Sequence, residues 1–202
     1  MPVDARLSAQ LTAWSATPPA PAHRDALLAL AGWIRDRPRA DLLFVCTHNS
    51  RRSHLAQLWA QAAALHAGLA QVQTWSGGTE ATALYPRVAA TLRAQGFTLE
   101  DTGERRSPRN AVYAASFGPG TPTHRVFSKV YGDPPNPQRD FAAIMVCDSA
   151  DAACPLVAGA ALRVSLPFVD PKASDGTDEE AATYAARSMQ IGAEMAWMAR
   201  QV

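Results

Sequence analysis

The chain has 202 residues, of which 48% are hydrophobic and 18% charged, enough apolar material for the core of about one domain. Its net charge of +1 leaves no surplus of basic residues to neutralise a nucleic-acid backbone, so we expect no nucleic-acid partner. No apolar run approaches the roughly 18 residues of a membrane span, and no cationic head precedes an apolar stretch at the start. Three cysteines are too few and odd in number for a disulfide framework. We therefore expect a cytoplasmic protein without a membrane partner.

Residues 1–40 predict a helical extension ahead of the main domain. Apolar residues at helical spacing fall in two groups, on either side of the proline-rich stretch 17–21: Leu7, Leu11 and Trp14, then Leu27, Leu30 and Ile34. The second helix is expected to end near Pro38. We favour two helices packed on the main domain over a partner-binding arm.

Residues 41–202 have the pattern of an α/β domain. Short apolar runs typical of buried parallel strands cover 42–46, 71–75, 142–147 and 162–166. Helical patterns separate them, one running from Pro86 to Gly96 and the last opened by a Thr177–Glu180 capping box. Alternating strands and helices predict a four-stranded parallel sheet flanked by helices.

An insertion at about residues 105–140 interrupts this alternation. It holds many of the prolines and few apolar runs, and only 125–131 has the pattern of a short strand or hairpin arm. A stretch of this length is expected to be ordered. We predict a semi-rigid cover that packs near the catalytic crevice and restricts substrate size.

The end of the first strand carries the chemistry. Cys46 is followed six positions later by Arg52, and Ser53 leads into a helix. At the carboxyl end of a strand, a helix N-terminus presents N–H groups and partial positive charge to an oxyanion. A guanidinium can hold two oxygens of that anion, and the same field favours the cysteine thiolate.

This pattern predicts an oxyanion-binding loop with a nucleophilic cysteine. The residues expected to bind the anion are Thr47, His48, Asn49, Ser50, Arg51 and Arg52, with Ser53 donating a hydrogen bond to the thiolate. The alternative is a core cysteine beside surface arginines. A zinc site at Cys46 and His48 is disfavoured because the other cysteines lie far off in sequence, and we expect neither a metal nor a cofactor.

The loop resembles the anion-binding loop of the low-molecular-weight protein tyrosine phosphatases and of the thioredoxin-coupled arsenate reductases that share their fold. The family loop reads Cys-x-Gly-Asn-x-Cys-Arg-Ser, and the matching positions here are Cys46, Asn49, Arg52 and Ser53. His48 replaces the usual glycine and must adopt a backbone shape that glycine serves. Arg51 replaces a common cysteine and faces either the anion or solvent. The resemblance runs from about Leu42 to the C-terminus, apart from the insertion.

Two further cysteines favour the reductase branch. Cys147 and Cys154 bracket an acidic, alanine-containing loop in CDSADAACP. This segment resembles the arsenate reductases in the spacing of its cysteines and in the proline after the second. The alternative is a buried strand residue at Cys147 and an incidental thiol at Cys154.

Asp170 precedes a proline after the fourth strand, where the resemblance implies a general acid; the alternative is a turn residue. Phosphatases usually continue with tyrosines that line a phosphotyrosine slot. Lys172 and Ala173 stand here instead, which favours a small inorganic oxyanion. An acidic residue that helps to bind potassium in the family corresponds to Gln57, so no cation site is expected.

The resemblance implies reduction of arsenate to arsenite. Cys46 attacks arsenic while Asp170 protonates the leaving oxygen. Cys147 then forms a disulfide with Cys46, and Cys154 carries this disulfide outward to thioredoxin. The first alternative is a low-molecular-weight phosphatase acting on phosphotyrosine or a small phosphoester. The second is a non-enzymatic module that senses anions or oxidation.

Overall fold

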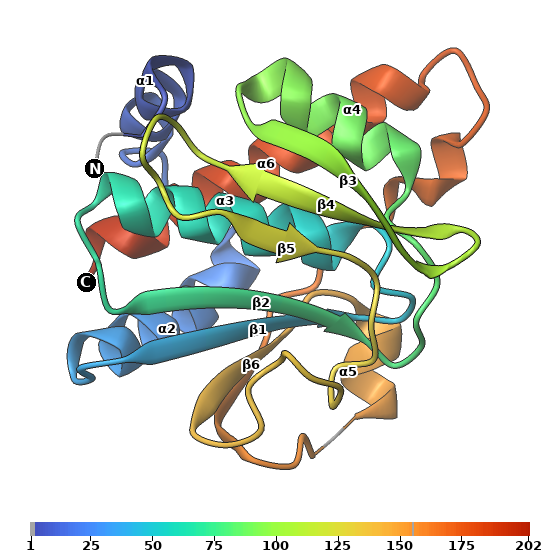
Figure 1. Ribbon diagram of the computed structural model, residues 1–202. Helices are drawn as coiled ribbons and strands as arrows, with labels where there is room; N and C mark the ends of the chain where they lie inside the picture. Colours follow the sequence, from blue (N-terminus) through green and yellow to red (C-terminus); the bar gives the residue numbers. More distant parts are fainter. Residues whose placement is uncertain (1–2, 155) are drawn as a thin grey trace.

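The computed structural model describes residues 3–154 and 156–202, and its core is a parallel sheet (Figure 1). The strands lie in the order β2-β1-β6-β7. Their bounds are β1 (Ala40–Cys46), β2 (Val72–Gly78), β6 (Phe141–Met145) and β7 (Ala160–Ser165). The predicted four-stranded parallel sheet is thereby confirmed. Pro155, which follows the second redox cysteine of the sequence pattern, lies outside the described residues.

The central strand explains the continuous apolar run of the sequence. All seven residues of β1 are buried, because β2 and β6 pair with its two edges and both faces are covered. Only Asp41 is charged, and its carboxylate binds Arg39 Nε at 2.7 Å and accepts from Trp75 Nε1 at 2.8 Å. The strand therefore ends at Cys46 in a fixed position between its two neighbours.

Helices follow the strands and cover the sheet. α3 (Arg52–His66) packs against β1 and β2, and the long α6 (Glu180–Arg200) lies beside α3 (Figure 1). α4 (Pro86–Gln95) packs on α6 and ends at Gly96, whose φ of 110° suits glycine. The short α5 (Asp148–Ala153) follows β6.

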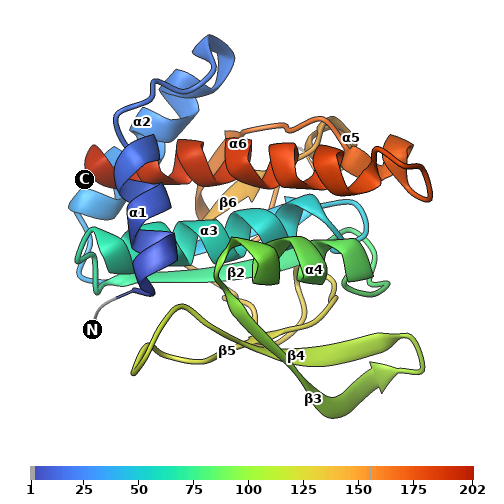
Figure 2. The same ribbon diagram turned by 90° about the horizontal axis from the view of Figure 1, so that it is seen from above.

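The N-terminal extension forms two helices joined by a short turn. Its elements are α1 (Ala5–Trp14), the 3-10 turn η1 (Pro21–His23) and α2 (Arg24–Arg35). Figure 2 shows α1 lying across α3 and α6. The predicted apolar faces pack inward, since Leu7, Leu11, Leu27 and Leu30 are fully buried.

The insertion is a second sheet rather than a proline-rich cover. β3 (Thr98–Ser107), β4 (Asn110–Ser116) and β5 (His124–Val126) pair antiparallel in that order. Figure 2 shows this sheet separated from α6 by α3 and α4. The chain then returns to the main sheet, where Val130 forms an isolated parallel bridge with Gly78 at the end of β2. β3 begins before the predicted boundary at residue 105.

One predicted helix start differs. The Thr177–Glu180 capping box does not form, because the Thr177 hydroxyl donates to the Ser174 carbonyl at 2.8 Å and Glu179 occupies the N-cap without a side-chain bond. The short turn η2 (Pro171–Ser174) precedes this segment instead. No helix in the described residues is long and apolar enough to cross a membrane.

Candidate active site

The residues between β1 and α3 surround a small hollow at the carboxyl end of the sheet. Its lining comes from this loop and from the segment after β7: Cys46, His48, Ser50, Arg51, Arg52 and Asp170. Asp170 is more than 100 positions from Cys46 in sequence, and it reaches the loop because β7 ends at the same edge as β1. Thr47 and Asn49, also predicted to bind the anion, do not line the hollow with these residues.

Cys46 has a hydrogen-bond donor directly at its sulfur. Cys46 Sγ lies 3.1 Å from Ser53 Oγ, and Asn49 Nδ2 donates to the same Ser53 oxygen at 2.8 Å. The Ser53 hydroxyl can donate its single proton to the sulfur while its oxygen accepts from Asn49. This places a hydroxyl donor beside the candidate nucleophile.

The loop turns at Asn49 and not at His48. Asn49 has a left-handed φ of 43°, and His48 is not among the described non-glycine residues with positive φ. The expectation that His48 takes up a glycine-like shape is therefore wrong. Asparagine tolerates this region better than most residues, because its short polar side chain can bond locally.

The buried His54 side chain holds the turn at Asn49 through a hydrogen bond. Burial and the positive charge of Lys129 lower the pKa of His54 to about 3, so its ring is neutral. The Asn49 carbonyl can only accept, so Nε2–H donates to it at 2.8 Å. Nδ1 therefore accepts from the Ser76 hydroxyl at 3.2 Å. The sequence offered no partner pattern for His54.

Arg52 and Asp170 form an ion pair over the hollow. Arg52 Nη2 lies 2.6 Å from Asp170 Oδ2, and Nη1 donates to the Phe168 carbonyl at 3.0 Å. Arg52 Nε is buried and has no hydrogen-bond partner among the described residues. A buried N–H without a partner is costly, and an oxyanion in the hollow would satisfy it.

The sequence left two orientations open for Arg51, toward the anion or toward solvent. In the structure it is largely buried and is held by other side chains. Its side chain is 13% exposed and pairs with Asp175 through Nη2, while Nε donates to the Tyr184 hydroxyl at 2.6 Å. The guanidinium carbon lies 4.2 Å from the centre of the Tyr85 ring. Tyr184 in turn donates to Asp175 at 2.6 Å. These contacts fasten the loop to the start of α6.

The second cysteine touches the loop. Cys147 Sγ lies 3.6 Å from Thr47 Oγ1, because Val146 N–H donates to the Val45 carbonyl and keeps β6 in line with β1. Cys147 also caps α5, accepting from Ala150 N–H at 3.4 Å. The predicted loop between the cysteines is thus largely helical.

Cys154 lies at the other end of α5. Burial raises the pKa of Tyr131, and the neighbouring Cys154 side chain raises it further. The Cys154 thiol therefore lies beside Tyr131. Cys46, Cys147 and Cys154 are all buried and free of disulfides.

The insertion supplies a brace for the loop, formed by Asn110, Ser128 and Lys129. Lys129 N–H donates to Asn49 Oδ1 at 2.9 Å, and Ser128 Oγ donates to the His48 carbonyl at 3.1 Å. Asn110 holds Ser128 from both sides, donating to its carbonyl at 2.8 Å and accepting from its N–H at 3.1 Å. No residue of the brace was predicted to serve the site, because the two bonds that reach the loop each link positions 80 apart in the sequence.

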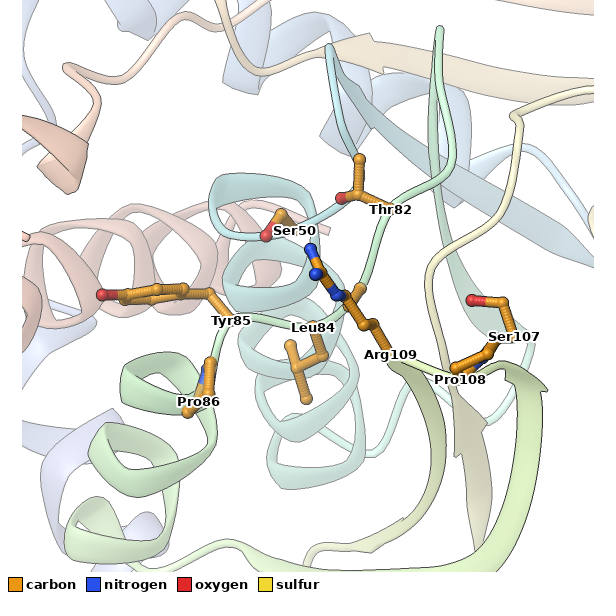
Figure 3. A pocket seen from close by; sticks show the side chains of 9 residues that line it. Ser50, Thr82, Leu84, Tyr85, Pro86, Ser107, Pro108 and Arg109 are labelled. Carbon is orange, nitrogen blue, oxygen red and sulfur yellow. The ribbon is translucent and has the colours of Figure 1, made fainter.

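A larger cavity of about 480 Å³ adjoins the hollow (Figure 3). Ser50 lines both. The other lining residues come from the segment before α4 and from the β3–β4 turn: Thr82, Ala83, Leu84, Tyr85, Pro86, Ser107, Pro108 and Arg109. In the described part of the chain, no group of three or more His, Cys, Asp or Glu residues could hold a metal ion.

Comparison with known proteins agrees with this geometry. Residues 41–113 match the family model "Low molecular weight phosphotyrosine protein phosphatase". No curated protein matches the chain in sequence. The match to the family model ends inside the insertion, and it covers β1, the loop, α3, β2 and α4.

Solved structures of such phosphatases share the fold. A mutant of YwlE from Bacillus subtilis is 16% identical, with a TM-score of 0.53 over 80% of this chain and 97% of that one. A low-molecular-weight protein tyrosine phosphatase from T. tengcongensis is 15% identical, with a TM-score of 0.51 over 81% and 99%. A YwlE arginine phosphatase mutant with a phosphorylated active-site serine is 15% identical, with a TM-score of 0.53 over 80% and 94%. The resemblance to the low-molecular-weight phosphatase superfamily is thereby confirmed.

Proposed function

We propose that this chain, which resembles the low-molecular-weight phosphatases in fold and over residues 41–113, reduces arsenate to arsenite through Cys46, Cys147 and Cys154, with thioredoxin as electron donor. The observation that carries this proposal is the position of Cys147. Its sulfur lies 3.6 Å from the Thr47 hydroxyl, at the edge of the oxyanion loop. Phosphoester hydrolysis uses one cysteine and water, so it gives no role to a second buried thiol there.

The first half of the cycle forms a covalent adduct. Arsenate sits in the hollow with its oxygens on Arg52 and the loop N–H groups. The Cys46 thiolate attacks arsenic and forms a sulfur–arsenic bond, while an As–OH bond of hydrogen arsenate breaks and its hydroxyl leaves as water with a proton from Asp170. Asp170 lines the hollow together with Cys46 and Arg52, and a bound arsenate that takes over Arg52 would free the Asp170 carboxyl group from the ion pair so that it can carry this proton.

The second half moves two electrons. The Cys147 thiolate attacks Cys46 Sγ and forms a disulfide, and the sulfur–arsenic bond pair passes to arsenic, which leaves as arsenite. The Cys154 thiolate next attacks Cys147, releases the Cys46 thiolate and forms the Cys147–Cys154 disulfide. A thioredoxin dithiol reduces this disulfide and is itself oxidised.

The last disulfide requires α5 to open. A six-residue helix is about 9 Å long, whereas the Cα atoms of a disulfide lie within about 7 Å. Cys147 and Cys154 flank α5 at its two ends. The relay therefore predicts that α5 unwinds when Cys154 attacks.

Single substitutions of the three cysteines test the relay, with turnover followed as NADPH oxidation by thioredoxin, thioredoxin reductase and arsenate. Cys46→Ser should lose arsenate reduction and any aryl-phosphate hydrolysis. Cys147→Ser should lose reduction alone. Cys154→Ser should release about one arsenite per enzyme and stall as a Cys46–Cys147 disulfide, detected by peptide mass spectrometry. Wild-type turnover by Cys147→Ser would contradict the relay.

A second candidate function, phosphomonoester hydrolysis at Cys46, is favoured by the cavity of about 480 Å³ beside the loop. Arsenate has no substituent to place there, whereas a phosphoester has one. Hydrolysis of an aryl phosphate by Cys147→Ser at the wild-type rate, without arsenate reduction by the wild type, would select this function.

A further inference from the structure

We propose that the cavity beside the oxyanion loop binds the organic group of a phosphomonoester, and that Arg109 binds a carboxylate on that group. The inference goes beyond arsenate reduction, and it rests on the oxyanion loop of the proposed function and on the second candidate reaction. It assigns a ligand class to the β3–β4 turn, which has no role in the proposed arsenate reduction.

The position and lining of the cavity fit an organic group attached to a bound oxyanion. Ser50 lies in the loop and lines both the hollow and the cavity, so the two adjoin at this residue and a ligand would extend from one to the other past Ser50. The cavity volume lies within the usual range of small-molecule sites, roughly 300–1,000 Å³. Leu84, Pro86 and Pro108 provide apolar surface. The Tyr85 backbone N–H donates to the Ser50 carbonyl at 3.1 Å and fixes the shared wall.

Arg109 is the basic group of this cavity. It stands in the turn between β3 and β4, and Figure 3 shows its guanidinium extended toward Ser50 and Thr82. No acidic residue lines the cavity in residues 3–154 and 156–202. The Arg109 side chain is exposed at the surface, and within the same described residues it forms no hydrogen bond or ion pair.

The other arginines of this sheet are occupied. Arg105 binds the Asp101 carboxylate through both Nη atoms, at 2.7 and 2.9 Å. Arg125 pairs with Glu104, and the Arg106 guanidinium lies 5.3 Å from the centre of the Phe127 ring. Arg106 also lines a smaller cavity of about 250 Å³, but among these four Arg109 alone lines the cavity that adjoins the oxyanion loop. A planar guanidinium over an apolar cavity matches a carboxylate, which it can bind through two parallel hydrogen bonds.

The ligand class follows from these three features. Its phosphoryl group occupies the hollow at Cys46, its ring or chain packs on the apolar wall, and its carboxylate reaches Arg109. Phosphate esters of hydroxy acids have this composition. An ester without the carboxylate should bind through the first two features only.

The test uses phosphonates, which resist hydrolysis. Protection of Cys46 from iodoacetamide is measured by peptide mass spectrometry with inorganic phosphate, phenylphosphonate and 4-carboxyphenylphosphonate. In the wild type, the carboxylated compound should protect at about tenfold lower concentration than phenylphosphonate, as a charge-assisted hydrogen bond supplies. Arg109→Ala should remove this difference and leave protection by inorganic phosphate unchanged.

Arg105→Ala is the matched control, because it removes an arginine of the same hairpin that is already paired. It should keep the tenfold preference. Equal protection by the two phosphonates in the wild type, or an unchanged preference in Arg109→Ala, would overturn the inference while the loop stands. Failure of inorganic phosphate to protect Cys46 in the wild type would overturn the oxyanion loop, and with it both the proposed function and this inference.

Discussion

The N-terminal extension and the insertion are both additions to the parallel sheet and both bury apolar side chains in its core, yet only the insertion donates hydrogen bonds to the oxyanion loop. The extension buries apolar side chains, with Leu7 and Leu27 fully inaccessible. Ser8 and Thr12 of its helix α1 form hydrogen bonds with His66, the last residue of α3. His66 lies at the opposite end of α3 from Arg52. The insertion also buries apolar side chains, such as Phe117 and Val126, but in addition it donates hydrogen bonds to the loop at His48 and Asn49.

This difference separates two physical roles. Apolar burial lowers the free energy of the folded state without directional requirements. Hydrogen bonds fix distances and angles, and a displacement of about 1 Å at a reacting group can cost about 100-fold in rate. We therefore expect changes in the extension to alter stability and changes in the insertion to alter oxyanion chemistry.

The largest expected effect is on stability and comes from Leu27→Ala in α2. Leu27 is fully buried, so truncation leaves a cavity and should lower the free energy of unfolding by about 2–5 kcal/mol. Arsenate turnover of the folded fraction should stay unchanged. Leu28→Ala is the matched control, because Leu28 is 42% exposed and its loss should cost less than about 0.5 kcal/mol. Urea unfolding measures both, and a turnover defect in Leu27→Ala would break the comparison.

Gly78→Ala should have the largest effect on chemistry. A Cβ at Gly78 would lie 2.6 Å from both the Asn49 nitrogen and the Thr47 oxygen, and these backbone atoms of the loop would have to move. Arsenate turnover should fall by about 100-fold. Gly132→Ala is the control in the insertion, since nothing lies within 4 Å of its Cβ. Normal turnover in Gly78→Ala would show that the loop tolerates displacement.

Asn110→Ala weakens the brace without touching the loop. Ser128 loses both of its bonds to Asn110, so its backbone is less firmly held and the bond from its hydroxyl to the His48 carbonyl, which Thr82 N–H still supports, should weaken. The phosphate concentration that half-protects Cys46 from iodoacetamide should rise about tenfold, the equivalent of one hydrogen bond. Thr121→Ala serves as control, because its hydroxyl bonds only within the insertion, to Phe117 and Gly118. Equal shifts in both variants would mean that general loosening of the insertion is the cause.

The smallest expected effect is on the pH dependence of stability. It comes from His23, the residue of the extension that packs against Phe168, two positions before Asp170. Its hydrogen bond to Glu194 raises the pKa of His23 against the opposing effect of burial, and its ring lies 5.2 Å from that of Phe168. A raised pKa stabilises the fold below the unfolded value of about 6.5 and loses this contribution as pH rises through the folded value.

Wild-type stability should therefore fall by about 1 kcal/mol relative to His23→Gln between pH 5.5 and 8.5. Urea unfolding at the two pH values measures it. Parallel pH dependence in the two proteins would remove His23 as the cause.

Elements whose sequence shows a regular pattern could be predicted. β1 and β6 are continuous apolar runs because they lie in the middle of the sheet, and Pro86 and Gly96 delimit α4. The spacing from Cys46 to Arg52 and Ser53 likewise indicated a turn between a strand and a helix, and the contacts of Ser53 with Cys46 and Asn49 are local, whereas the contacts from the insertion and from Asp170 are not.

β3 gave no such pattern. Leu99 is its only buried residue, and the rest of TLEDTGERRS is exposed, so no alternation of apolar and polar residues is present. A charged strand of this kind forms because β4 pairs with it and not because of its own side chains. The contacts of Arg51 could not be predicted either, since its partners Asp175 and Tyr184 lie more than 120 positions away in the sequence. In addition, the capping-box pattern had suggested another start for α6, the helix that holds Tyr184.

The helix α5 has a consequence for the timing of the proposed relay. Arg163 donates to the carbonyls of Asp151 and Cys154 at 2.9 and 3.0 Å, and Ser165 donates to the Asp151 carboxylate at 2.8 Å. These bonds hold α5 on β7 and must break before Cys154 can reach Cys147. The transfer is therefore a local unfolding event that exposes surface. Mild urea, below the concentration that unfolds the sheet, should accelerate this one step while it slows every step that needs the intact loop.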